Sequence, residues 1–214
     1  MVERVLRRAR QSSEKLERRC QILGAAELLF AQGEGELPTV QAIADRAGLA
    51  KGTVYLYFTT LEEIFLSLLG EHMVKWMSEA QEKLRRLTLP ITPDKVAAAM
   101  NAYPVSHPVV MRLASVAAFQ IARPGMEEAY FAFKRQCSNN LTQFGAFLEE
   151  NLAGLEKGRG AAAVLKAVAI TFGLWQVANP SLDSLTLRQP EVLRLDFARE
   201  LPCMLRSHWR GEVS

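Results

Sequence analysis

One short segment combines a cation, hydroxyl groups and a glycine in a way that suits contact with a nucleic acid. Lys51 can contact a phosphate or a guanine edge, and Thr53 can hydrogen-bond to a base or touch a thymine methyl group. Gly52 adds no side chain, so the backbone can approach a partner closely. Tyr55 and Tyr57 follow in the same expected helix, 51–57. The indicated chemistry is recognition through charge and hydrogen bonds.

A helix-turn-helix is the element expected to position these side chains. Thr39 is a good N-cap for a first helix, whose apolar residues then recur at helical spacing up to residue 47. Ala44, Gly48 and Val54 supply a small residue, a turn residue and a core residue at the offsets that such a pair of helices needs. An ordinary helical hairpin inside a larger bundle is the alternative.

Composition sets broad limits. The 214 residues are 49% hydrophobic, which is enough for a real core, and no uninterrupted run of 18 apolar residues indicates a membrane span. The N-terminal segment is charged rather than apolar, so we expect no ordinary secretory signal. Three widely separated cysteines, Cys20, Cys137 and Cys203, indicate neither a disulfide framework nor a zinc cluster. Reduced thiols predict a cytoplasmic protein.

The charge is unevenly distributed along the chain. The whole chain has a net charge of +3, whereas residues 1–19 contain seven basic and three acidic residues, a local balance of +4. A basic end on a nearly neutral body suits a protein that holds phosphate with one end. We expect a flexible arm in which Arg4, Arg7 and Arg8 reach the minor groove. A solvated tail without that role is the alternative.

The rest of the chain predicts an all-α protein, since apolar stripes are long and no hairpin signal appears. Thr60 and Glu63 match a capping box, which predicts a long helix from residue 60. Pro190 is expected to open the final helix, and Pro202 is expected to kink it or end it early. The other helices are expected near 12–32, 39–47, 51–57, 92–103, 106–120, 124–148 and 159–178, with the final helix over 191–209.

Polar residues within apolar runs are candidates for ligand binding, because each needs a partner when buried. They are His72, Asn101, Gln120, Asn140 and Gln176. An apolar or aromatic ligand, rather than a charged one, is expected, although an aromatic stripe of this kind is more often ordinary core. The candidate lining residues are Trp76, Met100, Tyr103, Met111, Phe119, Tyr130, Phe133, Phe144, Phe172 and Trp175.

The segments 22–33, 39–48 and 51–58, with the helix opening Glu62-Glu-Ile-Phe65, closely resemble the TetR family of bacterial transcriptional regulators over residues 14–70. The resemblance implies a homodimer with an N-terminal three-helix DNA-binding domain and a larger C-terminal helical domain for ligand binding and dimerisation. It also implies double-stranded DNA with a palindromic operator as partner. Most members repress, and a ligand typically releases them.

The resemblance also implies domain limits and DNA contacts. We expect a DNA-binding domain over 1–60, with the basic arm at 1–12 and the helix-turn-helix at 39–58, and a regulatory domain over 61–214 that dimerises through its last two helices. One departure is Leu61, where family members commonly have a lysine that reaches a phosphate. The expected DNA contacts are Thr39, Gln41, Lys51, Gly52, Thr53, Tyr55, Tyr57 and Thr60.

Two other function classes remain open. A helical enzyme is not supported, because the sequence has no nucleophile elbow, HExxH motif or phosphate loop, and His72, His107 and His208 are scattered. We therefore expect no catalytic residues, no cofactor and no metal site. A regulator controlled by a protein partner is the other alternative, which a filled core without a connected cavity would favour.

Overall fold

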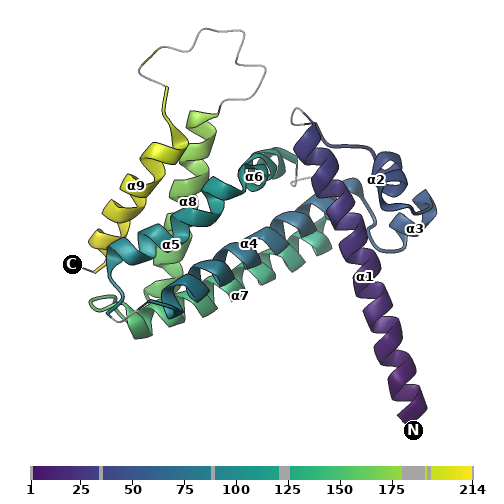
Figure 1. Cartoon of the computed structure of the whole chain (residues 1–214), viewed down its shortest axis with the longest axis horizontal. Coiled ribbons are helices and arrows are strands. Elements are labelled where there is room, and N and C mark those ends of the chain that lie inside the picture. Colours follow the sequence, from purple (N-terminus) through teal and green to yellow (C-terminus); the bar gives the residue numbers. More distant parts are fainter. Residues whose placement is uncertain are drawn as a thin grey trace. The chain divides into compact units, whose positions relative to one another are not determined.

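The computed structural model describes residues 2–33, 36–87, 90–120, 126–179, 191 and 194–213, and within them the side chains from residue 13 onward except those of 117–120. These residues form helices and loops, with one isolated bridge between Ile91 and Leu152 and no strand, so the all-α prediction is confirmed. The helices, drawn in Figure 1, are α1 (Val2–Gln32), α2 (Val40–Ala47), α3 (Lys51–Tyr55), α4 (Leu61–Arg85), α5 (Pro93–Ser106), α6 (Pro108–Gln120), α7 (Glu127–Asn151), α8 (Gly160–Ala178) and α9 (Phe197–Glu212).

The chain divides into two compact units. The N-terminal unit contains Met1–Leu69 and Val116–Tyr130, and the C-terminal unit contains Gly70–Ser115 and Phe131–Ser214. Helix α4 is continuous across the division at Leu69 and Gly70. Any change in the axis of α4 therefore acts on residues of both units.

The N-terminal unit has an aromatic and aliphatic core. Phe30 and Phe65 lie with their ring centroids 5.6 Å apart, and Phe58 is 1% exposed, as expected for a core residue. Ile43 and Val54, on α2 and α3, are fully buried. Helix α2 packs against α1, and α3 packs against α2. The two short helices depend on such contacts for their stability, since helices of this length are marginal alone.

Helix α1 begins much earlier than its sequence signals predict. We expected a start near Ser12 or Ser13, but the backbone is helical from Val2. The expectation of a flexible arm is therefore wrong for this backbone. The segment consists largely of arginine, alanine, leucine and glutamate, which are good helix formers, and it contains neither glycine nor proline. The side chains of Arg4, Arg7 and Arg8 lie outside the described part.

The start of α4 is capped, although not in the expected reciprocal way. The Thr60 hydroxyl accepts a hydrogen bond from the Glu63 amide at 3.1 Å. The Glu63 carboxylate accepts from the amide of Thr59 at 2.6 Å, rather than from that of Thr60. The Thr60 hydroxyl also donates to the Met126 sulfur at 3.1 Å. This joins the start of α4 to the residue that precedes α7.

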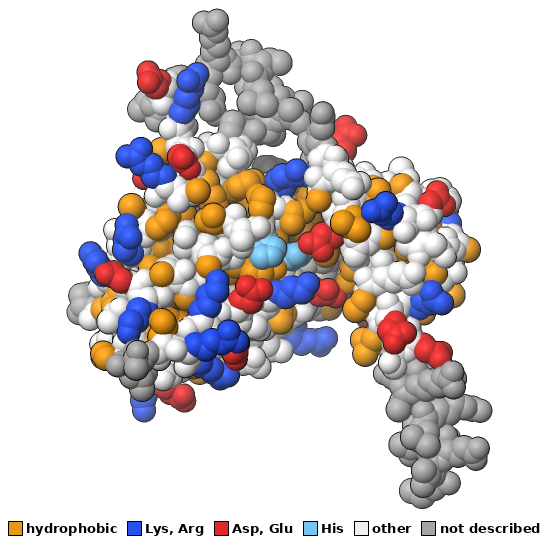
Figure 2. Space-filling model, viewed as in Figure 1, with side chains coloured by type: hydrophobic (Ala, Val, Ile, Leu, Met, Phe, Trp, Pro, Cys, Tyr) orange, Lys and Arg blue, Asp and Glu red, His pale blue; other side chains and the backbone are white. Residues whose placement is uncertain are grey.

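In the C-terminal unit, α9 packs against both α5 and α8. Leu201, Leu205 and Trp209 of α9 are fully buried. At the surface, the Arg210 guanidinium donates to both oxygens of Asp94 at 2.9 and 2.8 Å. Figure 2 shows hydrophobic side chains at the displayed surface, with charged side chains between them.

The bounds of α9 differ from those expected. It begins at Phe197, where Asp196 accepts hydrogen bonds from the amides of Ala198 and Arg199 at 3.0 and 3.2 Å. Pro190 lies outside the described residues. The helix continues past Pro202 to Glu212, because the one backbone bond that proline removes is outweighed by the buried face on either side of it.

Within the described residues, α8 is long and apolar enough to cross a membrane by length and composition alone. The sequence itself indicates no span, since Lys166 interrupts the apolar run. A core helix meets the same criterion, and one face of α8 is buried through residues such as Ala163, Ala167 and Leu174. This one helix is therefore weak evidence for a membrane.

Candidate nucleic-acid interface and ligand-binding core

The turn between α2 and α3 has the predicted construction. Thr39 is extended and accepts a hydrogen bond from the Ala42 amide at 3.2 Å. Gly48 is in the left-handed region with φ 66° and ψ 33°, which a residue with a Cβ rarely adopts. The Leu49 amide then donates to the Ala44 carbonyl at 2.9 Å, which closes the end of α2. The chain thereby reverses within a few residues.

Two buried residues hold the second helix in place. Val54 has no exposed surface, and its carbonyl accepts hydrogen bonds from the amides of Tyr57 and Phe58, both at 3.0 Å. The Arg19 guanidinium from α1 lies over the Phe58 ring, 4.5 Å from its centroid. Gln21, also on α1, donates to the Ala47 carbonyl at 2.6 Å. Helix α1 thus supports the helix-turn-helix at the end of α2 and at the residue that closes the motif, Phe58.

The expected DNA contacts differ in their exposure to solvent. Lys51, Gly52 and Tyr55 are exposed on α3, whereas Thr53 and Tyr57 are half-buried, so part of each packs against the unit. The outer surface of α3 therefore presents a cation, bare backbone and an aromatic hydroxyl.

The other expected contacts are already engaged within the protein. Thr39 is exposed while it caps α2, so capping and phosphate contact are compatible. Gln41 is exposed and donates to Asp45 at 2.7 Å. Thr60 is half-buried and its hydroxyl is engaged by Glu63 and Met126. Thr60 is thus the least available of the expected contacts.

Part of the expected ligand set meets in the core of the C-terminal unit. His72 Nδ1 lies 2.7 Å from the Tyr103 hydroxyl, and both residues are 2% exposed. The Trp76 indole donates to the Met100 carbonyl at 2.8 Å, and its ring lies edge-on to Phe172 with centroids 6.2 Å apart. This aromatic core contains a hydrogen-bonded polar pair, which suits a ligand that is apolar with a polar group.

The remaining candidates are more dispersed. Met111 is fully buried, and Phe144 is buried and stacks on Phe147. Gln176 is exposed, so the premise that it is a buried polar residue is wrong. Phe133 lies near the Cα of Gly70, and Tyr130, 36% exposed, belongs to the N-terminal unit.

Two asparagine side chains are also among the candidate ligand residues. Asn101 Oδ1 and Asn140 Nδ2 are buried with no hydrogen-bond partner among the described residues. The side chains of Phe119 and Gln120 lie outside the described part.

A cavity of about 370 Å³ opens near the end of α8, and of the expected ligand residues only Trp175 lines it. Trp175 and Phe197 lie edge to face with centroids 5.0 Å apart. No pattern in the sequence predicts this cavity, because it depends on how α5, α6, α8 and α9 pack. Its lining residues are Pro104, Val105, Pro108, Trp175, Ala178, Asn179, Leu195, Asp196, Phe197 and Ala198.

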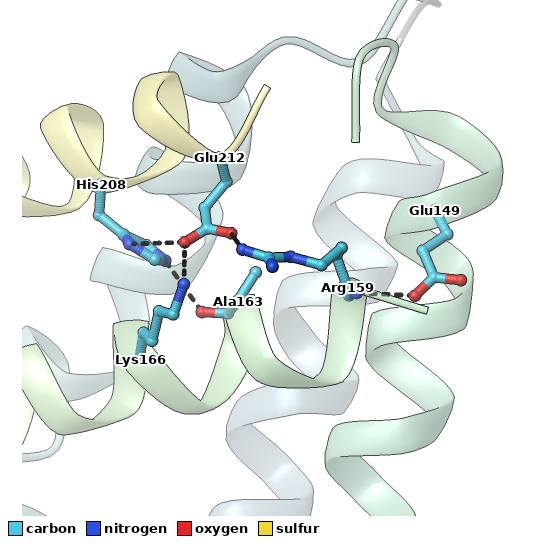
Figure 3. A network of polar contacts seen from close by, with 7 residues as sticks. Glu149, Arg159, Ala163, Lys166, His208 and Glu212 are labelled. Atoms are coloured by element: carbon cyan, nitrogen blue, oxygen red, sulfur yellow. Dashed lines mark hydrogen bonds and ion pairs between the residues drawn. The ribbon is translucent and has the colours of Figure 1, made fainter. Parts of the chain in front are cut away.

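A polar network ties α8 to the end of α9 (Figure 3). Glu212 pairs with Lys166 at 2.6 Å and with Arg159 at 3.8 Å, and His208 contacts the Ala163 carbonyl at 2.9 Å. The hydrogen bond from Lys166 lowers the pKa of Glu212. These contacts hold helices together and leave no free nucleophile.

Two titratable groups of the C-terminal unit have pKa values shifted by their surroundings. Backbone amides of Gly158 and Gly160 lower the pKa of Glu149, which accepts from Gly160 at 2.7 Å. Burial raises the pKa of Cys137 to about 11, so this thiol stays protonated at neutral pH. The described residues contain no group of three histidine, cysteine, aspartate or glutamate side chains that could hold a metal ion.

Two family models match the chain. A model described as "Bacterial regulatory proteins, tetR family" matches residues 22–68, and one described as "Tetracyclin repressor-like, C-terminal domain" matches residues 70–213. Together they include the helix-turn-helix and most of the C-terminal unit.

Similar proteins support the same grouping. The fatty acid metabolism regulator protein of Bacillus subtilis (strain 168) is 37% identical over 65 residues, which is 30% of this chain and 34% of that protein. Matches to three curated relatives span no more than 40% of their length.

Solved structures show the likeness of fold over nearly the whole chain. The fatty acid degradation regulator FadR from Bacillus halodurans superimposes with a TM-score of 0.59 at 18% identity, over 91% of this chain and 95% of that one. FadR from Bacillus subtilis in complex with stearoyl-CoA gives a TM-score of 0.52 at 18% identity, over 91% and 97%.

Proposed function

Because the chain belongs to the tetR family of bacterial regulatory proteins, we propose that it is a sequence-specific DNA-binding regulator of transcription that represses in its ligand-free form. The observation that carries this proposal is the helix-turn-helix, with Thr39, Gly48 and Val54 in their structural roles and Lys51 exposed. Such a protein acts in the bacterial cytoplasm, where the DNA is, and is not an enzyme.

Helix α3 enters the major groove of the operator in this proposal, and α2 lies across the backbone. Lys51 and the tyrosine hydroxyls of Tyr55 and Tyr57 contact phosphates or guanine edges, and Thr53 contacts a base. Phosphate contacts position the protein and base contacts specify the sequence. Leu61 provides no charge at the start of α4, so Lys51 and the basic end of α1 supply the positive charge for binding.

The operator is palindromic because the protein acts as a dimer. Helix α8 buries one face and exposes a stripe of small and apolar residues on another, which suits close packing with a second copy. Two recognition helices about 34 Å apart then reach successive major grooves. The exposed stripe consists of Ala162, Leu165, Ala169, Gly173 and Val177.

The C-terminal unit binds a small apolar ligand, with the core around His72 and Trp76 as its site. The support is the buried aromatic set and the hydrogen-bonded pair of His72 and Tyr103 within it. Fatty-acyl compounds are the first class to test, since similar proteins carry the names of fatty acid regulators and one was solved with stearoyl-CoA.

Helix α4 is the proposed mechanical link. It carries Phe65 in the core of the N-terminal unit and His72 and Trp76 in the C-terminal core. A ligand that binds one conformer of α4 more tightly would shift the population toward it. The two α3 helices would then no longer match the spacing of the half-sites.

Selection of genomic fragments by the purified protein, at a stated salt concentration, tests the DNA-binding function. The expected result is a set of fragments that share one palindrome, from which addition of stearoyl-CoA or a free fatty acid releases the protein. Fragments without any shared sequence would contradict the proposal. If the protein stayed bound to the palindrome with every ligand tried, the DNA-binding proposal would stand. The proposal that an apolar ligand releases the protein would be contradicted.

A further inference from the structure

Leu56 is the most exposed large hydrophobic side chain in the part of the chain where side chains are described, at 80%. The backbone of Leu56 is nevertheless fixed by its neighbours. Its amide donates to the Thr53 carbonyl at 3.1 Å, and the buried residues Val54 and Phe58 lie two positions before and after it. The backbone therefore holds Leu56 at the surface at the end of α3.

Leu56 has a specific neighbour on this surface. Gly52 lies one helical turn earlier, is exposed, and has no atom within 4 Å of a Cβ placed on it. The surface one helical turn before Leu56 is therefore bare backbone that a partner can approach closely. Lys51 and Tyr55 are also exposed on the same short helix. The surface at α3 thus combines an exposed apolar side chain, bare backbone, a cation and an aromatic hydroxyl.

We propose that Leu56 determines sequence specificity by contacting the C5-methyl group of a thymine in the major groove. This inference rests on the proposed DNA-reading function of α3. Leucine has no group that can hydrogen-bond to a phosphate or a base edge, and the thymine methyl is the apolar feature that the major groove presents. The positive charge of the exposed Lys51 attracts this short helix to the anionic duplex. Leu56 thus prefers thymine to cytosine at one position in each half-site.

The test replaces each thymine of the selected palindrome in turn by deoxyuridine, which removes the methyl group and keeps base pairing. Affinity is measured for the wild type and for the Leu56→Ala variant. The wild type is expected to lose affinity when deoxyuridine stands at one symmetry-related pair of positions. The expected loss is about fourfold for each methyl group removed. The Leu56→Ala protein binds the thymine and uracil duplexes equally at those positions. Because Leu56 is exposed, this variant is expected to fold normally.

Two matched variants isolate the contribution of Leu56. Leu28→Ala removes a 49% exposed leucine from α1 and is expected to keep the full preference for thymine. Thr53→Ser removes the methyl group of the other residue expected to face a base, and this variant is expected to keep the preference at the Leu56 position.

The possible results distinguish this inference from the proposed function. If no palindrome is selected at all, the DNA-reading function fails. If a palindrome is selected but no position distinguishes thymine from uracil, or if Leu56→Ala keeps the full preference, the contact by Leu56 is refuted. Loss of the preference in Thr53→Ser but not in Leu56→Ala would assign the methyl group to Thr53 instead.

Discussion

The close approach of α7 and α8 gives a sharp prediction for the substitution Gly145→Ala. A Cβ placed on Gly145 would lie 2.6 Å from the Gly160 carbonyl carbon and 2.8 Å from the Ala161 Cα. These are backbone atoms that no rotamer change can move aside. The Ala161 amide nitrogen would lie closer still, and an ordinary contact begins at 3.4 Å, so the two helices would have to separate by more than about 0.8 Å.

The expected cost follows from three effects. Overpacking of a close contact costs about 1–3 kcal/mol, and the rigid backbone at Gly160 and Ala161 favours the upper end. Separation would also weaken the 2.7 Å hydrogen bond from the Gly160 amide to Glu149. Alanine regains about 1 kcal/mol over glycine through helix propensity. We therefore expect a net loss of about 2 kcal/mol, and a fall in Tm of about 4–8 °C.

Urea unfolding of wild type and variant at one protein concentration measures this loss, since a dimer's stability depends on concentration. The control is Gly24→Ala, which also lies within a helix but has no atom within 4 Å of the added Cβ. The control should be as stable as the wild type or slightly more stable. A Gly145→Ala protein as stable as the control would refute the argument from close packing.

Three further predictions test the core, the polar network and the dimer. Tyr103→Phe removes the buried partner of His72 Nδ1 and should destabilise the protein by about 1–3 kcal/mol in urea unfolding. Glu212→Gln should lower the free energy of unfolding at pH 7. The folded-state pKa of Glu212 lies below its ordinary 4.5, so this difference should persist above pH 4.5 and shrink as pH falls further. Ala169→Glu places charge in the exposed stripe of α8 and should produce monomers in sedimentation.

Matched variants make these results interpretable. Tyr55→Phe removes the hydroxyl of an exposed ring and should leave the free energy of unfolding unchanged. A loss as large as that of Tyr103→Phe would show that the hydrogen bond to His72 is not the cause. Glu150→Gln, on an exposed part of α7, should leave the free energy of unfolding at pH 7 nearly unchanged. Ala146→Glu adds the same charge to the exposed surface of α7 and should remain dimeric. Dimers of Ala169→Glu at micromolar concentration would argue against pairing through α8.

Features set by neighbouring residues were predictable from the sequence. The N-cap at Thr39, the left-handed Gly48 and the buried Val54 follow from local turn chemistry and helical spacing, and all three are present. The long helix from residue 61 likewise follows from the capping residues before it. These signals act over a few residues, so distant packing does not overrule them.

Helix ends without a strong local signal were harder to predict. Serines at 12 and 13 resemble caps, but the helix-forming residues before them continue α1 to Val2. Pro190 and Asp196 both can open a helix, and the structure uses Asp196 for α9. Helix propensity and capping favour different starting residues at such places. The sequence alone does not show which of the two has the larger effect.

The ligand residues were only partly predictable, because burial and free space depend on packing between helices. His72, Trp76 and Tyr103 do meet in the core. Gln176 lies on the exposed face of α8, although its neighbours are apolar. The cavity beside Phe197 is lined by residues of four helices, and α8 and α9 are far from α5 and α6 in the sequence, so no motif marks it.

Helix α3 is the element on which the proposed DNA reading depends. The most direct measurement is the affinity for the selected palindrome over a series of salt concentrations, for wild type and Lys51→Ala. If each Lys51 of the dimer neutralises one phosphate, the slope of log affinity against log salt should become shallower by about 1.8, with weaker binding throughout. Lys75→Ala, an exposed lysine in the middle of α4, should leave both unchanged. Unaltered affinity and slope for Lys51→Ala would contradict the docking of α3 on DNA.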